Sequence, residues 1–148
     1  MKNQDFTTTI IVDQSPDQVF NALKNPQNWW SGEIEGNSSQ IDDEFTYQYK
    51  EFHESTQRVV EMIPNKKIVW LVTESAINYA KDKKEWTGTK IVFEISESDN
   101  KTQLRFTHVG LDPSIECFDS CSNSWSMLIH QSLFHLITTG KVDKPVLA

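Results

Sequence analysis

The chain has 148 residues, of which 37% are hydrophobic and 24% are charged, a balance typical of a globular protein. This length is sufficient for one domain with a substantial core, so we predict a single domain over residues 1–148. The net charge of −7, from 14 basic and 21 acidic residues, repels the phosphates of nucleic acids and of anionic membranes. The composition therefore argues against nucleic acid as a partner.

The N-terminal region predicts a strand followed by a short helix. The strand covers Phe6 to Val12, where β-branched residues dominate. Ser15 is placed to cap the helix, Pro16 suits its first position, and Gln18 completes a capping box three residues after the cap. Asn25-Pro26 ends this helix, and a further helical turn is expected at the two tryptophans that follow.

Five strands are predicted in the middle of the chain. Their apolar and polar residues alternate with the period of two that places one face in a core. They cover Phe45 to Tyr49, His53 to Ile63, Lys67 to Ser75, Thr87 to Ser96 and Thr102 to Val109. The last two are expected to form a hairpin, in which Phe93, Phe106 and His108 point to the core side of their strands.

A long C-terminal helix is predicted from about Ser122 to Thr139. Its apolar residues, which begin with Trp125 and include Ile129, recur at the helical spacing. Gly140 ends the helix, because glycine readily adopts the left-handed conformation found after helix C-termini. Strands that are segregated from helices along the chain indicate the α+β class, with an antiparallel sheet.

Four segments, in this order, resemble the START-like (SRPBCC) superfamily: "SPDQVFNALKNPQNWW", "EWTGTKIVFEI", "THVGL" and "SWSMLIHQSLFHLITTGK". Within the superfamily, the similarity is greatest to the branch named after the activator of the heat-shock-protein-90 ATPase. The resemblance implies a helix-grip fold like that of the major birch-pollen allergen. In this fold a curved antiparallel sheet wraps around a long C-terminal helix, with a hydrophobic cavity between them.

Aromatic residues on the predicted inner faces are candidates for the wall of such a cavity. Small-molecule pockets are generally apolar with a few polar groups, and the tyrosines and His108 could orient a bound molecule. The alternative is that these side chains simply fill the core. The predicted ligand-binding residues are Trp30, Tyr47, Tyr49, Trp70, Phe93, Phe106, His108, Trp125 and Ile129.

His108 has two interpretations. A histidine whose pKa lies near neutral could act as a general base or hold a ligand. It could instead be tied to a backbone carbonyl at the end of its strand, and the local sequence places no carboxylate beside it. Glu85, just before the "TGT" segment, is the only other acid–base candidate, and a solvated loop position is the alternative for it.

Motifs for metals, nucleophiles and cofactors are weak. Cys117 and Cys121 have a C-x3-C spacing, which matches neither a thioredoxin pair nor a zinc motif, even with His130 or His135 added. The chain has no Gly-x-Ser-x-Gly elbow and no phosphate-binding loop, so we predict neither a metal nor any other cofactor.

The N-terminal sequence "MKNQDFTTTIIV" lacks the pattern of a signal peptide, and no apolar stretch approaches the roughly 20 residues that cross a bilayer. We therefore expect a cytoplasmic protein without membrane insertion.

The predicted function of the protein is non-enzymatic binding of a small hydrophobic molecule, of the lipid, sterol or aromatic polyketide type. One alternative is a protein-interaction module that activates a chaperone ATPase, for which the charged run "KDKKE" is a candidate surface. The other alternative is a cyclase- or hydrolase-like enzyme.

Overall fold

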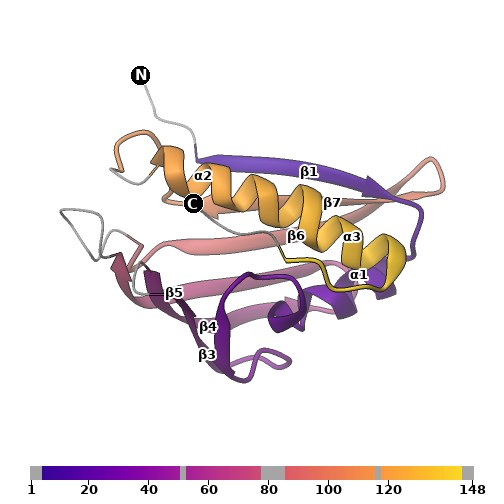
Figure 1. The fold of residues 1–148 in the computed structure, drawn as a ribbon. Coiled ribbons are helices and arrows are strands. Elements are labelled where there is room, and N and C mark those ends of the chain that lie inside the picture. The colour runs from indigo at the N-terminus through magenta and orange to yellow at the C-terminus, as the bar shows by residue number, and fades with distance from the viewer. Residues whose placement is uncertain (1–4, 51–52, 78–85, 116–117, 145–148) are drawn as a thin grey trace.

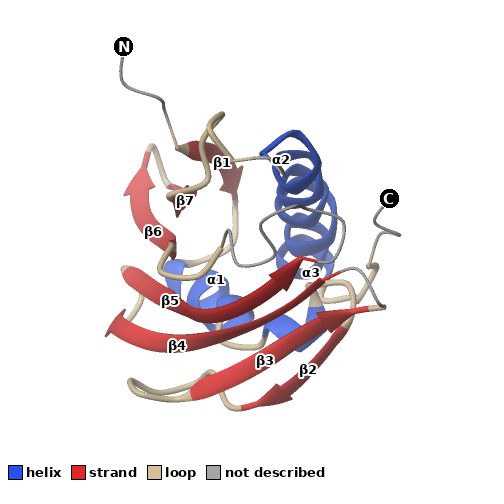
Figure 2. Ribbon diagram, turned by 90° about the vertical axis from the view of Figure 1, so that its left-hand side faces the viewer, coloured by secondary structure: helices blue, strands red, loops and turns tan. Residues whose placement is uncertain are grey.

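The computed structural model describes residues 5–50, 53–77, 86–115 and 118–144. These residues form one antiparallel sheet of seven strands, in the order β1-β7-β6-β5-β4-β3-β2. The strands are β1 (Phe6–Val12), β2 (Glu33–Gly36), β3 (Glu44–Tyr49), β4 (His53–Ile63), β5 (Lys67–Ile77), β6 (Lys90–Ser98) and β7 (Lys101–Val109). The sheet curves around the C-terminal helix, as Figure 1 and Figure 2 show, and the expected helix-grip fold is confirmed.

The first helix, α1 (Pro16–Leu23), begins at the predicted capping box. The backbone N–H of Gln18 donates to Ser15 Oγ at 3.3 Å, and the backbone N–H of Ser15 donates to Gln18 Oε1 at 3.0 Å. The helix buries one apolar face and is followed by a 3-10 turn, η1 (Pro26–Asn28). Trp29 and Trp30 follow this turn directly and lie in the core, where both are almost fully buried.

The two longest strands, β4 and β5, carry two irregularities in their pairing. Their pairing shifts register between Thr56 and Gln57, and again between Val59 and Glu61. Such bulges bend a strand and increase its twist. The bend gives the sheet a concave inner face, on which the C-terminal helix lies (Figure 2).

The C-terminal helix runs as α2 (Phe118–Met127), a π-helical segment η2 (Leu128–Leu133) and α3 (Phe134–Thr139). It ends as predicted, because Gly140 adopts a φ of 77° and its N–H donates to Leu136 O at 2.8 Å. The π-helical segment was not predicted. The fully buried hydroxyl of Ser132 donates a hydrogen bond to Trp29 O at 2.5 Å, and this bond stabilises the segment.

Two predicted boundaries require correction, and one strand was not predicted. The C-terminal helix begins at Phe118 rather than near Ser122. The first part of the strand predicted from Thr87 is a turn, in which the N–H of Thr89 donates to Trp86 O at 3.0 Å, so β6 begins only at Lys90. Strand β2 was not predicted, because it has only four residues and Ile34 is its single partly buried apolar side chain.

Candidate functional site

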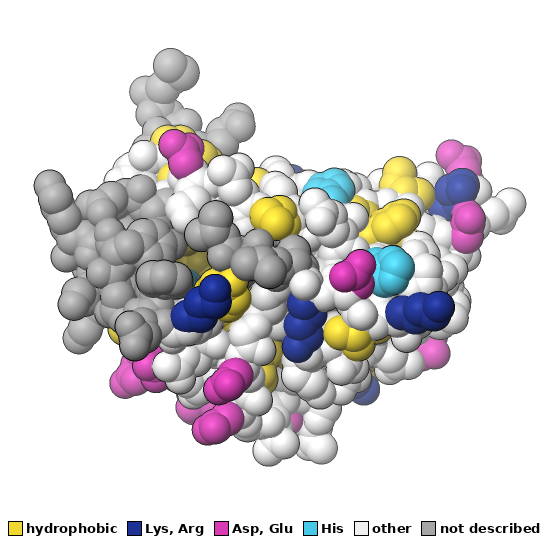
Figure 3. Space-filling view, viewed as in Figure 1, with side chains coloured by type: hydrophobic (Ala, Val, Ile, Leu, Met, Phe, Trp, Pro, Cys, Tyr) yellow, Lys and Arg dark blue, Asp and Glu magenta, His cyan; other side chains and the backbone are white. Residues whose placement is uncertain are grey.

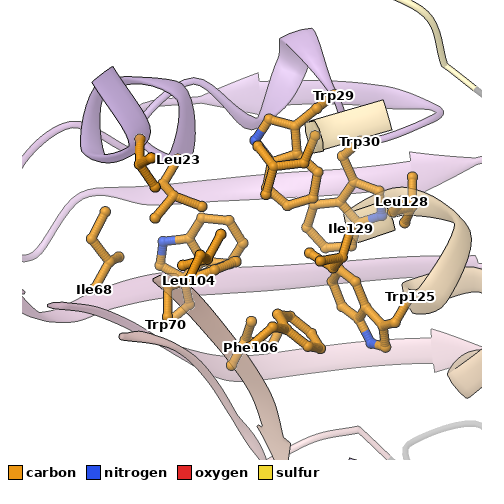
Figure 4. Close-up of a cluster of buried hydrophobic side chains, with 14 of the residues drawn as sticks. Leu23, Trp29, Trp30, Ile68, Trp70, Leu104, Phe106, Trp125, Leu128 and Ile129 are labelled. Atoms are coloured by element: carbon orange, nitrogen blue, oxygen red, sulfur yellow. The ribbon is translucent and has the colours of Figure 1, made fainter. Parts of the chain in front are cut away.

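Aromatic rings from the sheet and the helices form one continuous cluster beneath the C-terminal helix (Figure 4). The ring of Trp30 stacks on Tyr47 with 3.9 Å between centroids, and lies 5.1 Å from Trp125. Trp125 in turn lies 4.6 Å from Phe106 on β7. Of the nine predicted ligand-binding residues, eight are buried: Trp30, Tyr47, Trp70, Phe93, Phe106, His108, Trp125 and Ile129. The sheet and the helix thus bring together residues that lie far apart in the sequence.

Tyr49, the ninth predicted residue, is half-buried at the margin of this cluster. It borders an open surface pocket of about 450 Å³, together with Gly32, Glu33, Gln48 and Lys50. The ammonium group of Lys50 lies 5.3 Å from the centroid of the tyrosine ring. Tyr49 therefore lies at the edge of the candidate site rather than inside it.

Two further tryptophans, absent from the predicted set, belong to the cluster. The ring of Trp29 is nearly parallel to those of Trp30 and Trp70, with centroid distances of 6.2 and 6.4 Å. Trp86 lies nearly parallel to Trp125 at 5.9 Å and meets His53 edge-on at 4.3 Å. Trp86 thus connects the aromatic cluster to a group of polar side chains.

His108 is held by hydrogen bonds at both ring nitrogens. An indole N–H can only donate, so the bond of 3.1 Å from Trp125 Nε1 fixes His108 Nδ1 as the acceptor. The proton is then on Nε2, which donates to Thr89 Oγ1 at 2.8 Å, and the threonine hydroxyl donates to Trp86 O at 2.5 Å. The ring is therefore tied to a backbone carbonyl through one hydroxyl.

Burial and the neighbouring His53 lower the pKa of His108 to about 3. At neutral pH its imidazole is uncharged, and the nitrogen that a general base would use already accepts the indole proton. This arrangement favours the structural interpretation of His108, tied to a backbone carbonyl, over acid–base catalysis. The hydroxyl of Tyr47 is likewise engaged, since it donates to Ser31 O at 2.5 Å.

Strand β4 presents three polar side chains to the interior, His53, Ser55 and Gln57, which we call the β4 polar row. They alternate in phase with Val59, and their exposed fractions are only 9%, 1% and 0%. The sequence-based prediction missed this row. The signal for it was the strand period itself, because counting back from Val59 by twos reaches each of the three residues.

Most polar atoms of the row lack a protein partner. Within the described parts of the chain, no hydrogen-bond partner lies near His53 Nε2, Ser55 Oγ, either amide atom of Gln57, or Trp86 Nε1. Buried polar groups are nearly always paired, and each unpaired one costs about 1–3 kcal/mol of stability. Water or a bound molecule could supply the missing partners.

A second open pocket, of about 360 Å³, lies on the outer face of the sheet. Charged residues line much of it, among them Lys66, Glu94 and Arg105. Neither this pocket nor the one at Tyr49 opens onto the buried part of the β4 polar row.

Several predicted features lie outside the described residues, namely Cys117 and the whole "KDKKE" run, which ends with Glu85. Cys121 is buried on α2. Over the described ranges, no three histidine, cysteine, aspartate or glutamate side chains gather as a metal site would require. The same ranges contain no helix long and apolar enough to span a membrane.

Comparisons with known structures agree with the fold. The solution structure of the Aha1 dimer from Colwellia psychrerythraea is 25% identical in sequence, with a TM-score of 0.74, over 95% of this chain and 99% of that one. The crystal structure of SSP2350 from Staphylococcus saprophyticus is 17% identical, with a TM-score of 0.70, over 98% and 100% of the two chains. CalU16 from Micromonospora echinospora is 15% identical, with a TM-score of 0.65, over 93% and 77%.

No curated protein sequence matches the chain. The family profile described as "Activator of Hsp90 ATPase homolog 1-like protein" matches residues 13–137, which include every described strand after β1 and nearly all of the C-terminal helix. The expected resemblance to this branch is thereby confirmed. The chain belongs to the family of Activator of Hsp90 ATPase homolog 1-like proteins.

Proposed function

We propose that the protein binds a small, mostly hydrophobic molecule between the sheet and the C-terminal helix, as a cytoplasmic protein of one domain. The observation that carries this proposal is the β4 polar row, which is buried against aromatic rings with most of its polar atoms unpartnered. A chain optimised only for stability would place apolar residues on this inner face. Polar groups retained at a stability cost are typical of sites that complete their hydrogen bonds with a ligand.

The aromatic cluster would supply the apolar wall of this site. Trp30, Trp125 and Phe106 provide broad ring faces, while Trp70, Phe93 and Ile129 extend the wall on either side. Tyr47, Tyr49 and His108 complete the proposed set, with Tyr49 at its margin. We propose binding without a chemical step, because the structure engages both nitrogens of His108 in fixed hydrogen bonds.

A thermal-shift screen tests this proposal. Purified protein is heated with fatty acids, sterols, flavonoids or polyketide-like aromatics, each in turn. A ligand present at 100 times its dissociation constant should stabilise the protein by about 2.7 kcal/mol, a rise of roughly 5–10 °C in the midpoint. Tyr47→Ala and Phe106→Ala should weaken any such effect. A screen without a hit, in which a reference binding protein responds normally to its own ligand, would contradict the proposal.

The second candidate function is contact with a chaperone ATPase. It is supported by the description of the family and by the 25% identity to the Colwellia protein named Aha1. Side chains of both charges, with exposed hydrophobic ones between them, cover the face seen in Figure 3. We expect such a complex to weaken as ionic strength rises, because exposed charges are screened by salt. An Hsp90-type ATPase whose rate is unchanged by added protein would contradict this candidate.

A further inference from the structure

We propose that α2 opens as one unit about the π-helical segment η2, while η2 and α3 stay in place. A hydrogen bond from Trp125 to His108 is the latch that holds α2 closed. Such an opening is a property of the chain itself, with or without a bound molecule. Four features of the molecule support it: the composition of α2, the different attachment of the two halves of the C-terminal helix, the π-helical hinge, and unpartnered polar atoms beneath α2.

The sequence of α2, "FDSCSNSWSM", is poor in residues that favour a helix. Its serines, asparagine and aspartate have short polar side chains that compete for backbone hydrogen bonds. The buried side chains of α2 are Cys121, Ser122 and Trp125, of which only Trp125 is large, while Phe118 and Met127 are partly buried. The helical form of α2 therefore depends on tertiary packing, and chiefly on Trp125.

The two halves of the C-terminal helix are attached in different ways. Ser132 Oγ donates to Trp29 O at 2.5 Å, and His130 Nε2 lies 2.5 Å from Thr8 Oγ1, so η2 is held on two sides. α3 contacts α1 and β1 directly. α2 instead meets the sheet through the ring of Trp125, which reaches from the helix toward the strands (Figure 4). Movement of α2 would leave the contacts of η2 and α3 intact.

The segment η2 is suited to act as the hinge. The N–H of Phe134 donates to Ile129 O, five residues back, where an α-helix would bond four residues back. Such π-helical turns are rare, and helices bend at them. The bond from Ser132 to Trp29 O fixes η2, and the indole N–H of Trp29 in turn donates to Ala22 O at 3.2 Å. The helix can therefore bend on the N-terminal side of a fixed point.

A buried chain of hydrogen bonds closes α2 onto the sheet. Trp125 Nε1 donates to His108 Nδ1 at 3.1 Å, and His108 Nε2 donates to Thr89 Oγ1 at 2.8 Å. The hydroxyl of Thr89 donates to Trp86 O at 2.5 Å. This chain joins α2, β7 and the turn before β6. Because one hydrogen bond changes an equilibrium by roughly two- to tenfold, weakening this chain should shift α2 toward the open form without unfolding the domain.

Three polar atoms at this end of the interior favour opening. Ser122 Oγ on α2, Trp86 Nε1 and His53 Nε2 are buried and have no hydrogen-bond partner within the described ranges. The ring of Trp86 lies 5.9 Å from that of Trp125, so it lies beneath α2. Water admitted by an opening of α2 would give these atoms hydrogen bonds that the closed form lacks. This gain partly offsets the exposure of Trp125.

Amide hydrogen exchange, followed by NMR in 0–1 M urea, tests the opening in the unmodified protein. Relative to their intrinsic rates, the backbone amides of Trp125 and Ser126 should exchange at least roughly tenfold faster than those of Leu136 and Ile137. Exchange in α2 should also be nearly independent of urea, because a local opening exposes little surface. Equal protection and equal urea dependence in α2 and α3 would overturn the proposal.

The variant Thr89→Val tests the latch, because valine has nearly the shape of threonine and lacks the hydroxyl that His108 contacts. Exchange in α2 should become about two- to tenfold faster, while exchange in α3 stays unchanged. The matched control is Thr107→Val, which removes a hydroxyl 3.1 Å from that of Thr7 and should alter neither half. Equal acceleration of both halves, or no acceleration of α2, would contradict the role of this chain as the latch.

Discussion

Replacing Trp125 with alanine should lower the free energy of unfolding by about 3–5 kcal/mol, the range found for large buried aromatic side chains. Trp125 is 1% exposed and contacts the rings of Trp30, Trp86 and Phe106 at 5.1, 5.9 and 4.6 Å. It joins the C-terminal helix to three other parts of the chain. Its loss would also leave His108 Nδ1 without the indole donor.

Urea denaturation of both proteins at pH 7.5 measures this effect. Phe134→Ala is the matched control, because Phe134 lies on the same helix and is 38% exposed. The control should cost far less than the change at Trp125. An unchanged midpoint for Trp125→Ala would contradict the role of Trp125 as the anchor of the helix.

Lowering the pH from 7 to 5 should destabilise the protein by several kcal/mol through its two buried histidines. The folded state holds the pKa of His53 at about 4 and that of His108 at about 3, both below the unfolded value of 6.5. Between these values the unfolded chain binds more protons than the folded one, so stability is full above pH 6.5 and falls as the pH drops. At pH 5 each histidine contributes a loss of about 2 kcal/mol.

Urea unfolding at pH 7, 6 and 5 measures this dependence, and His53→Gln should remove about half of it. Comparing pH values within one variant cancels the direct effect of the substitution on stability. A free energy of unfolding that stays constant between pH 7 and pH 5 would show that neither histidine is buried in its neutral form.

Most of the fold could be predicted because its inner faces are strongly apolar. The β-branched residues of β1 predicted its observed bounds, and the capping box and Gly140 correctly marked one end of each helix. The failures lie where this local signal is weak. β2 is short and largely exposed, and the π-helical segment depends on the contact between Ser132 and Trp29, 103 residues apart.

The site was predicted mainly in its aromatic part. Large aromatic residues on inner faces are buried in almost any arrangement of the sheet, so their clustering follows from the pattern. Polar residues in a strand ordinarily mark its solvent-exposed face. The buried positions of His53, Ser55 and Gln57 were therefore not predicted. The partner of His108 could not be predicted from neighbouring residues, because Trp125 reaches it from the C-terminal helix.

The central claim, that a bound molecule completes the hydrogen bonds of the β4 polar row, is tested most directly by proton–nitrogen NMR. During titration with a ligand identified in the thermal-shift screen, the indole N–H of Trp86 and the side-chain amide of Gln57 should shift most, since both lack partners among the described residues. The indole N–H of Trp29 is the internal reference, because it already donates to Ala22 O at 3.2 Å and should shift little. Saturable shifts at Trp86 and Gln57 are the predicted result. Shifts confined to surface groups such as Lys50, with Trp86 and Gln57 unmoved, would contradict the claim.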